Sequence, residues 1–177
     1  MNIGYNGFVR IVLDIKNNPT YTGALVGAEV TLPIPSRITK ITVFSLYGLL
    51  ESIGKVGYSI PTLHRMLSDL TPILETEKRE RYIIIGGDFN ADVQLDKGRH
   101  HSHKIFFSRL EDFGLVNCHP ERQQTFFRKK TAPYQDDYIF VSENIKNYLK
   151  KDTGDVPKDD EALKHSDHKP VVVELNI

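Results

Sequence analysis

Residues 81–92 of the 177-residue chain read RYIIIGGDFNAD, and this stretch decides the fold. Residues 82–85 form a short apolar run rich in β-branched side chains, which predicts a strand buried on both faces. Two glycines end that run, where the backbone turns sharply or approaches another group closely. Asp88 and Asn90 then lie at the strand end. There a carboxylate can bind a divalent cation or accept a proton, and an amide can donate a hydrogen bond to an oxyanion. An ordinary strand exit is the alternative, because Gly, Asp and Asn are common turn residues.

Strand patterns outnumber helix patterns on both sides of this stretch. Runs rich in β-branched residues predict strands, at residues 8–15, 24–32, 38–46, 125–127, 138–141 and 171–177. Apolar residues spaced three and four apart predict amphipathic helices, at residues 60–74 and 102–112, with a short third helix opening at 142–143. We expect hairpins between 8–15 and 24–32 and between 125–127 and 138–141, and loops at 48–57 and 151–164. This mixture indicates a layered α/β or α+β domain.

The size and composition are those of one globular domain spanning residues 1–177. Lys+Arg and Asp+Glu both number 23, so no overall field attracts nucleic acid or an anionic membrane. An anionic substrate must then be held by a metal or a few placed residues. The one cysteine, Cys118, excludes an internal disulfide and a cysteine-based zinc site, which favours a reducing, cytoplasmic location. Without a leader pattern or a membrane-length apolar run, we expect no membrane association, and a monomer.

Two further segments place polar residues just before an apolar run. They are DDYIFVS at residues 136–142 and HSDHKP at residues 165–170. The Ser-Asp-His order in the second suggests a serine hydrolase, but neighbours on an extended segment point to opposite sides, so Asp167 cannot brace the His168 ring. The orienting carboxylate should come from elsewhere, and Asp137 is the best candidate, because a His–Asp pair fixes the tautomer and stabilises the charged ring.

Four motifs in this order resemble the endonuclease/exonuclease/phosphatase superfamily. They are FSLY at 44–47, GGDFN at 86–90, DDYIFVS at 136–142 and SDHKPV at 166–171. The resemblance implies a four-layered sandwich of two packed mixed β-sheets flanked by helices. It also implies cleavage of phosphoester bonds with Mg²⁺ or Mn²⁺ as the cofactor. Tyr47 would then hydrogen-bond a phosphate oxygen or assist the leaving group.

The resemblance implies a role for each remaining site residue. Asp88 would align or deprotonate the attacking water, and Asn90 would donate to a phosphate oxygen beside the metal. Asp167 would belong to the metal cluster, and His168, held by Asp137, would contact the scissile phosphate. Such attack on phosphorus needs charge neutralisation more than covalent chemistry. The implied catalytic residues are Tyr47, Asp88, Asn90, Asp137 and His168, and the implied metal ligands are Asp88, Asn90 and Asp167.

The sequence departs from the family pattern in two places. Asp136 stands where the family has an apolar residue, and we favour Asp137 as the site residue because it directly precedes Tyr138 and the strand. The family domain opens with a strand carrying an asparagine and a second strand ending in a metal-binding glutamate, and neither is found. Glu29 lies downstream of that position and is interpreted as a solvent-facing sheet residue. The chain therefore resembles a domain that is incomplete at its N-terminus.

The favoured function is a metal-dependent phosphodiesterase, a nuclease with DNA or RNA as substrate, because the DDY order at 136–138 is closer to the nuclease branch than to the phosphatases. A phosphomonoesterase acting on inositol, lipid or nucleotide phosphates is one alternative, and a catalytically impaired fragment or binding module is another. The histidines at 100, 101 and 103 are interpreted as a solvated loop rather than zinc ligands. The basic residues 128–130 form either a solvated hairpin tip or a grip on a nucleic-acid backbone.

Overall fold

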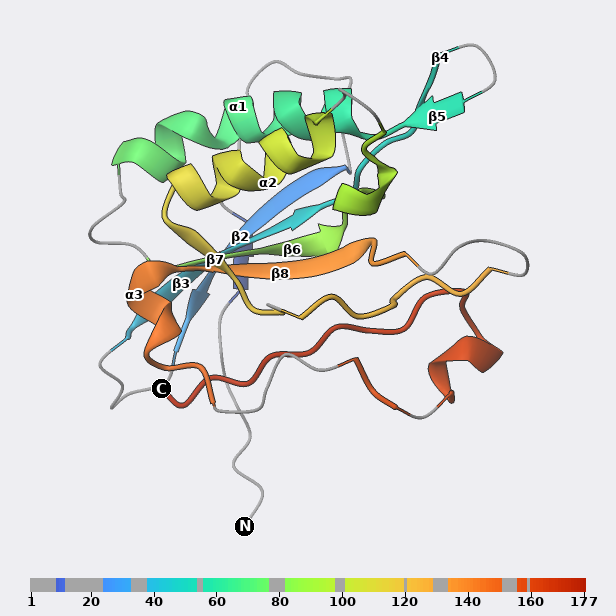
Figure 1. The fold of residues 1–177 in the computed structure, drawn as a ribbon. Helices are drawn as coiled ribbons and strands as arrows, with labels where there is room; N and C mark the ends of the chain where they lie inside the picture. Colours follow the sequence, from blue (N-terminus) through green and yellow to red (C-terminus); the bar gives the residue numbers. More distant parts are fainter. Residues whose placement is uncertain are drawn as a thin grey trace.

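A mixed β-sheet carries helices α1 and α2 on one of its faces (Figure 1). The structure is a computed structural model that describes residues 9–11, 24–32, 38–53, 56–76, 82–97, 101–119, 121–128, 134–150, 156–158 and 160–177. The strands are β1 (Val9–Ile11), β2 (Leu25–Thr31), β3 (Lys40–Leu46), β4 (Glu51–Ile53), β5 (Val56–Tyr58), β6 (Tyr82–Asp88), β7 (Leu115–Asn117) and β8 (Asp137–Ser142). The helices are α1 (Ile60–Thr76), α2 (Ser102–Asp112) and α3 (Glu143–Lys146), with short 3-10 turns at Val93–Leu95 and Ala162–Lys164.

The larger sheet has the strand order β1-β2-β3-β6-β8-β7 among the described residues, and β4 and β5 form a separate pair. Only β3 and β6 run parallel, and the other four neighbouring pairs in that sheet are antiparallel. Helix α1 lies in the connection between β3 and β6, as a parallel pair requires a long crossover. The expected hairpin between the first two strands is present as β1 and β2, whereas its turn lies outside the described residues.

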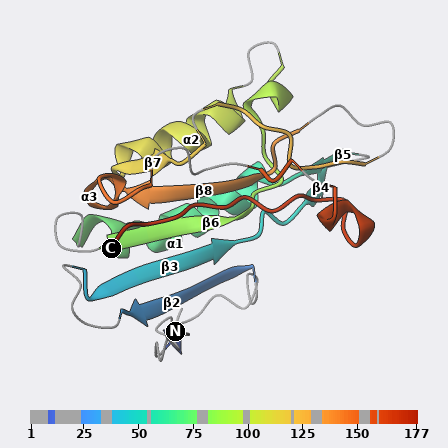
Figure 2. The ribbon, with the colours of Figure 1, turned by 90° about the horizontal axis from the view of Figure 1, so that it is seen from below.

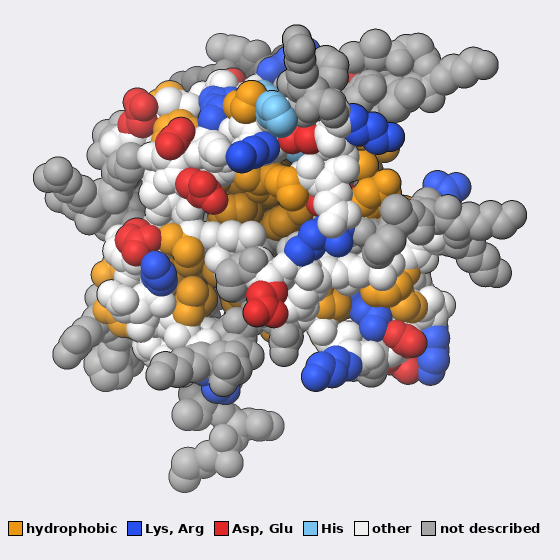
Figure 3. All heavy atoms as spheres, in the orientation of Figure 1, with side chains coloured by type: hydrophobic (Ala, Val, Ile, Leu, Met, Phe, Trp, Pro, Cys, Tyr) orange, Lys and Arg blue, Asp and Glu red, His pale blue; other side chains and the backbone are white. Residues whose placement is uncertain are grey.

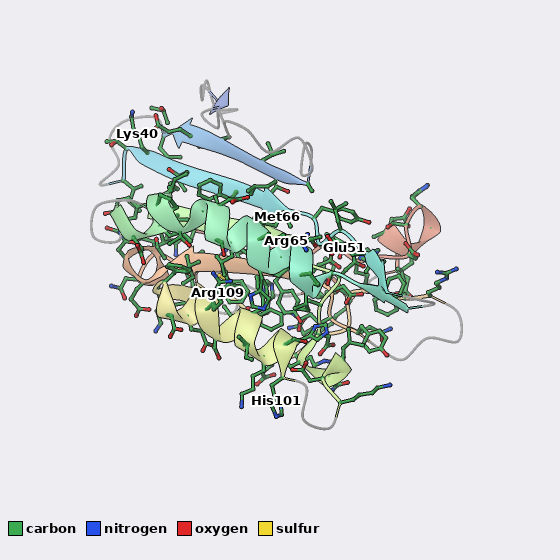
Figure 4. The ribbon with its side chains drawn as sticks, turned by 90° about the horizontal axis from the view of Figure 1, so that it is seen from above. Lys40, Glu51, Arg65, Met66, His101 and Arg109 are labelled. Carbon is green, nitrogen blue, oxygen red and sulfur yellow. The ribbon has the colours of Figure 1, made fainter. Side chains whose placement is uncertain are left out.

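The helix-facing side of the sheet holds the main core. The apolar stripe of α1 is fully buried, through Leu63, Met66, Leu67, Leu70 and Leu74. Each such side chain contributes about 1.5–3 kcal/mol by leaving water. In Figure 4, Arg109 of α2 lies against α1, where its Nη1 is 2.8 Å from Nδ1 of His64. Helix α1 also contacts the small hairpin β4–β5, because Arg65 donates to Glu51 at 2.6 Å (Figure 4).

The opposite face of the sheet is covered mainly by extended chain, together with the short helix α3. Figures 1 and 2 show the C-terminal segment running beneath β6 and β8. A second apolar cluster lies there, built on Ile38, Ile41, Val141 and Ile145. The α/β class is confirmed. Of the four expected layers, the described residues form a layer of helices and one large sheet. In place of a second large sheet, the C-terminal segment lies against the first one and forms only isolated bridges, such as that between Leu149 and Leu175.

Several local predictions are wrong. Residues 125–127 do not pair with 138–141, because β6 and β7 occupy the two edges of β8. Phe126 instead forms isolated bridges with Tyr134 and His168, and residues 171–177 form no regular strand. The expected loop at 48–57 contains the β4–β5 hairpin.

The two glycines of the central stretch do not end the strand. β6 continues through them to Asp88, with Gly86 paired to Ile139 and Gly87 paired to Tyr138. A Cβ atom on Gly87 would stand 2.2 Å from the Leu46 carbonyl oxygen, so glycine is needed here for the close approach of β3 and not for a turn. None of the described helices is both long enough and apolar enough to cross a membrane.

Candidate active site

The last residue of β6 and the first residue of β8 meet at one edge of the sheet. Asp88 and Asp137 are direct partners in the antiparallel register, so their side chains lie on the same face. That face is the one away from α1 and α2, since Tyr138 and Phe140 of β8 pack into the helix-side core. Two carboxylates are therefore placed together by strand pairing alone.

Asn90 fixes the orientation of the Asp88 carboxylate. The Asn90 backbone N–H donates to Oδ1 of Asp88 at 2.8 Å, and its Nδ2 donates to Oδ2 at 3.3 Å. The residue is in the left-handed region with φ 47°, which Asn tolerates better than most residues. Its Nδ2 also donates to the Gly48 carbonyl at 3.1 Å, and its own carbonyl accepts from Ser59 Oγ at 2.6 Å. The turn after β6 is thus tied to the loop after β3.

Asp137 holds the imidazole of His168. Oδ2 of Asp137 lies 2.8 Å from Nδ1 of His168, which places the Nδ1 proton between them and leaves Nε2 for another partner. The backbone of His168 bridges to Phe126, whose ring centroid is 4.9 Å from the imidazole. The His168 N–H also donates to Ser166 Oγ at 3.0 Å. The structure therefore brings together residues 31 positions apart in sequence.

Asp88, Asp137 and His168 form what we call the acid–histidine cluster. One ligand atom from each lies within 4.8 Å of the others, close enough to share one metal ion. Asp167 is exposed and outside this group. Tyr47 follows β3 and is 46% exposed, and the next residue, Gly48, donates to the Asp88 carbonyl at 2.8 Å. Asp167 and Tyr47 are therefore not members of the acid–histidine cluster.

The cluster concentrates negative charge in a half-buried place. Burial raises the pKa of Asp88, opposed by the Asn90 N–H and reinforced by the charges of Asp137 and Asp167. Burial lowers the pKa of His168, but the hydrogen bond that His168 donates to Asp137 and the surrounding carboxylates outweigh it, so the net pKa is raised. The site therefore favours a positive group, either a charged imidazole or a cation.

Asp136 is the buried neighbour of the cluster. It is 6% exposed, and burial together with the charges of Asp88 and Asp137 raises its pKa to about 7. A carboxyl with a raised folded-state pKa contributes stability that is complete below its unfolded value and lost as the pH rises through the folded value. For Asp136 that window runs from the ordinary aspartate value of 3.8 to about 7.

Asp136→Asn should therefore stabilise the protein at pH 8, by roughly 1–3 kcal/mol after allowance for solvent screening. The gain should shrink as the pH falls toward 5, because the wild-type carboxyl becomes protonated there. Urea unfolding at several pH values in EDTA measures this. Asp69→Asn makes the same substitution at an exposed position on α1 and is the matched control. A pH-independent effect of Asp136→Asn would contradict the assignment.

The contacts that support the residues of the cluster were not predicted from the sequence. Thr125 Oγ1 accepts from the backbone N–H groups of Asp136 and Asp137, at 2.9 and 3.1 Å. The fully buried Asp92 accepts from Arg122 Nε at 2.9 Å and from the Gln135 N–H at 3.0 Å. Arg122 and two backbone N–H groups lower the pKa of Asp92 although burial opposes them. The only signal in the sequence was an acid two residues after GDFN.

Other predicted features lie apart from the cluster. His101 is exposed, but His103 is 6% exposed, so the solvated-loop interpretation is wrong for it. His103 sits in the first turn of α2, where that helix packs on the core, and its backbone N–H donates to Asp96 Oδ1 at 3.1 Å. Residue 100 lies outside the described residues, as do 129 and 130 of the basic segment, while Arg128 is exposed. Glu29 lies on β2 and binds Lys40 at 2.8 Å.

A family model described as endonuclease-reverse transcriptase matches residues 41–172, a span that includes the whole acid–histidine cluster. The chain belongs to the endonuclease/exonuclease/phosphatase superfamily. No curated protein matches the sequence significantly.

Solved structures of this superfamily have the same fold. The endonuclease domain of TRAS1, a telomere-specific non-LTR retrotransposon, aligns with TM-score 0.67 and 18% identity over 99% of this chain and 71% of its own. The 3′ phosphatase NExo from Neisseria, bound to product DNA hairpin, aligns with TM-score 0.63 and 22% identity over 94% of this chain and 70% of its own. An AP endonuclease from Archaeoglobus fulgidus aligns with TM-score 0.58 and 16% identity, over 96% of this chain and 70% of its own. The chain thus spans about 70% of the length of these superfamily members.

Proposed function

We propose that this chain is a metal-dependent phosphodiesterase, and specifically a nuclease that hydrolyses phosphodiester bonds in DNA or RNA. The observation that carries the proposal is the acid–histidine cluster, whose three ligand atoms converge within 4.8 Å at the ends of β6 and β8. Superfamily membership supports the reaction class. The endonuclease domain of TRAS1 and the DNA-bound NExo support nucleic acid as the substrate.

The donors at the cluster fit a divalent cation such as Mg²⁺ or Mn²⁺. Carboxylate and amide oxygens are the ligands that hard cations prefer, and Asp88 and Asn90 supply one of each at the end of β6. Asp167 would complete the set of metal ligands from the solvent-exposed side. Its charge already raises the pKa of both Asp88 and His168. When bound, the cation would neutralise charge that develops on the phosphate oxygens.

The side chains would then divide the remaining work. Asp88 would orient an attacking water and accept its proton, since its carboxylate is held in one orientation by Asn90. His168 would donate from Nε2 to a phosphate oxygen, because Asp137 engages Nδ1 and stabilises the charged ring. Tyr47 would reach the leaving-group side from the end of β3, where its side chain is open to solvent.

The first experiment tests hydrolysis and its dependence on metal. Purified protein is incubated with plasmid, abasic-site DNA and RNA in Mg²⁺, Mn²⁺ or EDTA. We expect cleavage with either ion, complete loss in EDTA, and recovery when the ion is added back. Cleavage that persists in EDTA would rule out the metal mechanism. Binding of nucleic acid and Mn²⁺ without cleavage of any substrate would favour the binding-module alternative.

A phosphomonoesterase is a second candidate, because one solved neighbour is described as a 3′ phosphatase. The two activities are separated with one oligonucleotide that carries a 3′ phosphate and an internal abasic site. Release of inorganic phosphate with an intact strand indicates the phosphatase. Shortening of the strand indicates the nuclease.

A further inference from the structure

Thr125 is a fully buried threonine that contacts both chain segments of the Asp137–His168 pair. Its Oγ1 accepts from the backbone N–H groups of Asp136 and Asp137, at 2.9 and 3.1 Å. Its carbonyl accepts from the backbone N–H of Lys169 at 2.8 Å, one residue beyond His168. A single residue therefore joins the backbone of Asp137 to the segment that carries His168.

The segment 121–128 lies between β8 and the C-terminal segment (Figure 1). On one side, the Phe126 N–H donates to the Tyr134 carbonyl at 3.2 Å. On the other side, the Phe127 N–H donates to the Asp167 carbonyl at 2.7 Å. These backbone hydrogen bonds fix the separation of the two chain segments that meet in the acid–histidine cluster.

The contact between Asp137 and His168 needs this support because both side chains are partly open to solvent. The exposed fraction is 15% for the Asp137 side chain and 27% for the His168 side chain, so packing alone does not fix them. A hydrogen bond weakens steeply when its distance or angle departs from the ideal. A small shift of the Asp137 backbone would therefore free Nδ1 and allow the tautomer with its proton on Nε2.

Charged side chains of both signs are interspersed over the face of the molecule seen in Figure 3, rather than gathered into a basic patch. The whole chain likewise has a formal net charge of zero. Where no broad field guides an anion, a few precisely held groups have to orient it. The placement of the His168 ring then matters more than the total charge.

The contact with the start of β8 depends on the oxygen of Thr125, which accepts from two backbone N–H groups. Serine keeps that oxygen, whereas valine has the shape of threonine without it. Other hydrogen bonds hold the same segment, since Asp92 accepts from the Gln135 N–H at 3.0 Å and the Phe89 N–H donates to the Asp136 carbonyl at 2.7 Å. Loss of the oxygen should therefore shift the start of β8 without unfolding it.

We propose that Thr125 is a positioning residue that sets the contact between Asp137 and His168. Because it is fully buried, it acts through the backbone of Asp137 and the segment that carries His168. Its effect on the rate of hydrolysis rests on the proposed function. Its effect on the His168 ring needs neither substrate nor metal.

Thr125→Val tests the effect on hydrolysis. We expect kcat to fall about 10- to 100-fold, as is typical when a residue that orients a site group is removed, and KM to stay within about twofold. Thr125→Ser should stay within about threefold of wild type because it keeps the accepting oxygen. Thr71→Val makes the same change on α1, where the half-buried Thr71 donates to the Leu67 carbonyl at 3.0 Å, and it should leave the rate unchanged.

NMR of the histidine ring nitrogens in EDTA tests the inference without hydrolysis. At a pH where the ring is neutral, the spectra show which nitrogen carries the proton, and His168→Ala identifies the signals. We expect the proton on Nδ1 in wild type, Thr125→Ser and Thr71→Val, and a mixture of tautomers in Thr125→Val. Thr125→Ser and Thr125→Ala differ only in the hydroxyl, so they give the same comparison if the valine variant does not fold.

The two measurements separate this inference from the proposed function. If wild type hydrolyses no substrate but the tautomers are as expected, the proposed function fails and the role of Thr125 in the Asp137–His168 contact is supported. The same tautomer in Thr125→Val as in wild type, or in Thr125→Ala as in Thr125→Ser, would overturn the inference. A wild-type kcat in a folded Thr125→Val enzyme would also overturn it.

Discussion

His168→Ala should lower phosphodiester hydrolysis by about 100-fold or more while the protein stays folded. The imidazole lies 2.8 Å from Asp137 and is 27% exposed, so its removal takes a charged group from the site without opening a core cavity. Asp88→Ala should cause a loss of the same order, because the carboxylate would serve both the water and the cation. Initial rates measure the loss, and circular dichroism melting checks the fold.

His165→Ala is the matched control for this prediction. It removes the same ring from the same segment at an exposed position outside the acid–histidine cluster, and its rate should stay within about twofold of wild type. Adding Asp137→Asn to His168→Ala should cost little further activity, since the two side chains act as one unit. Wild-type rates in both His168→Ala and Asp88→Ala would refute the assigned roles.

The parts of the site that follow local rules were predictable from sequence. The spacing of Asp88 and Asn90 at the end of an apolar run indicated a strand end with paired polar groups, and the structure places them there. Asp167 is the neighbour of His168 on an extended segment, so the orienting carboxylate was expected from elsewhere in the chain. Asp137 was favoured over Asp136 because it directly precedes Tyr138 and the strand, and Asp137 is the acid that contacts the ring.

The parts that depend on which strands meet were not predictable. Residues 125–127 are Thr-Phe-Phe and residues 115–117 are Leu-Val-Asn, and β-propensity alone favours the first as the partner of β8. The structure selects 115–117, because α2 packs on the helix side and delivers β7 to the edge of β8. The pairing of Asp92 with Arg122 was missed for the same reason, since it joins positions 30 residues apart.

The glycines in the central stretch show a third limit of sequence reasoning. A Gly-Gly pair indicates either a turn or a close approach of backbone, and the letters do not say which. The structure shows the close approach, and the backbone contact is tighter at Gly87 than at Gly86. A Cβ atom on Gly86 would have its nearest contact at 3.0 Å, with the Tyr138 carbonyl oxygen, whereas on Gly87 it would stand 2.2 Å from the Leu46 carbonyl oxygen.

Gly87→Ala should therefore lower the free energy of unfolding by roughly 3 kcal/mol or more. The backbone φ of Gly87 is 139°, a conformation that residues with a side chain rarely adopt, and the clashing atoms belong to the β3 backbone, which cannot rotate away. Gly86→Ala is the matched comparison on the neighbouring residue and should cost about 1 kcal/mol, because it needs only a shift of a few tenths of an ångström. Urea unfolding of both variants in EDTA measures the difference.

The Gly87 substitution should also weaken the proposed metal site, and this separates it from a general loss of stability. The close approach at Gly87 draws the ends of β3 and β6 together, so that Gly48 donates to the Asp88 carbonyl at 2.8 Å and Asn90 reaches the Gly48 carbonyl. If Ala at position 87 forces β3 and β6 apart, these hydrogen bonds no longer hold Asp88 in position. Mn²⁺ affinity of the folded fraction should then fall for Gly87→Ala and change little for Gly86→Ala. Equal unfolding energies and equal Mn²⁺ affinities in the two variants would show that the contact between β3 and β6 does not position the site.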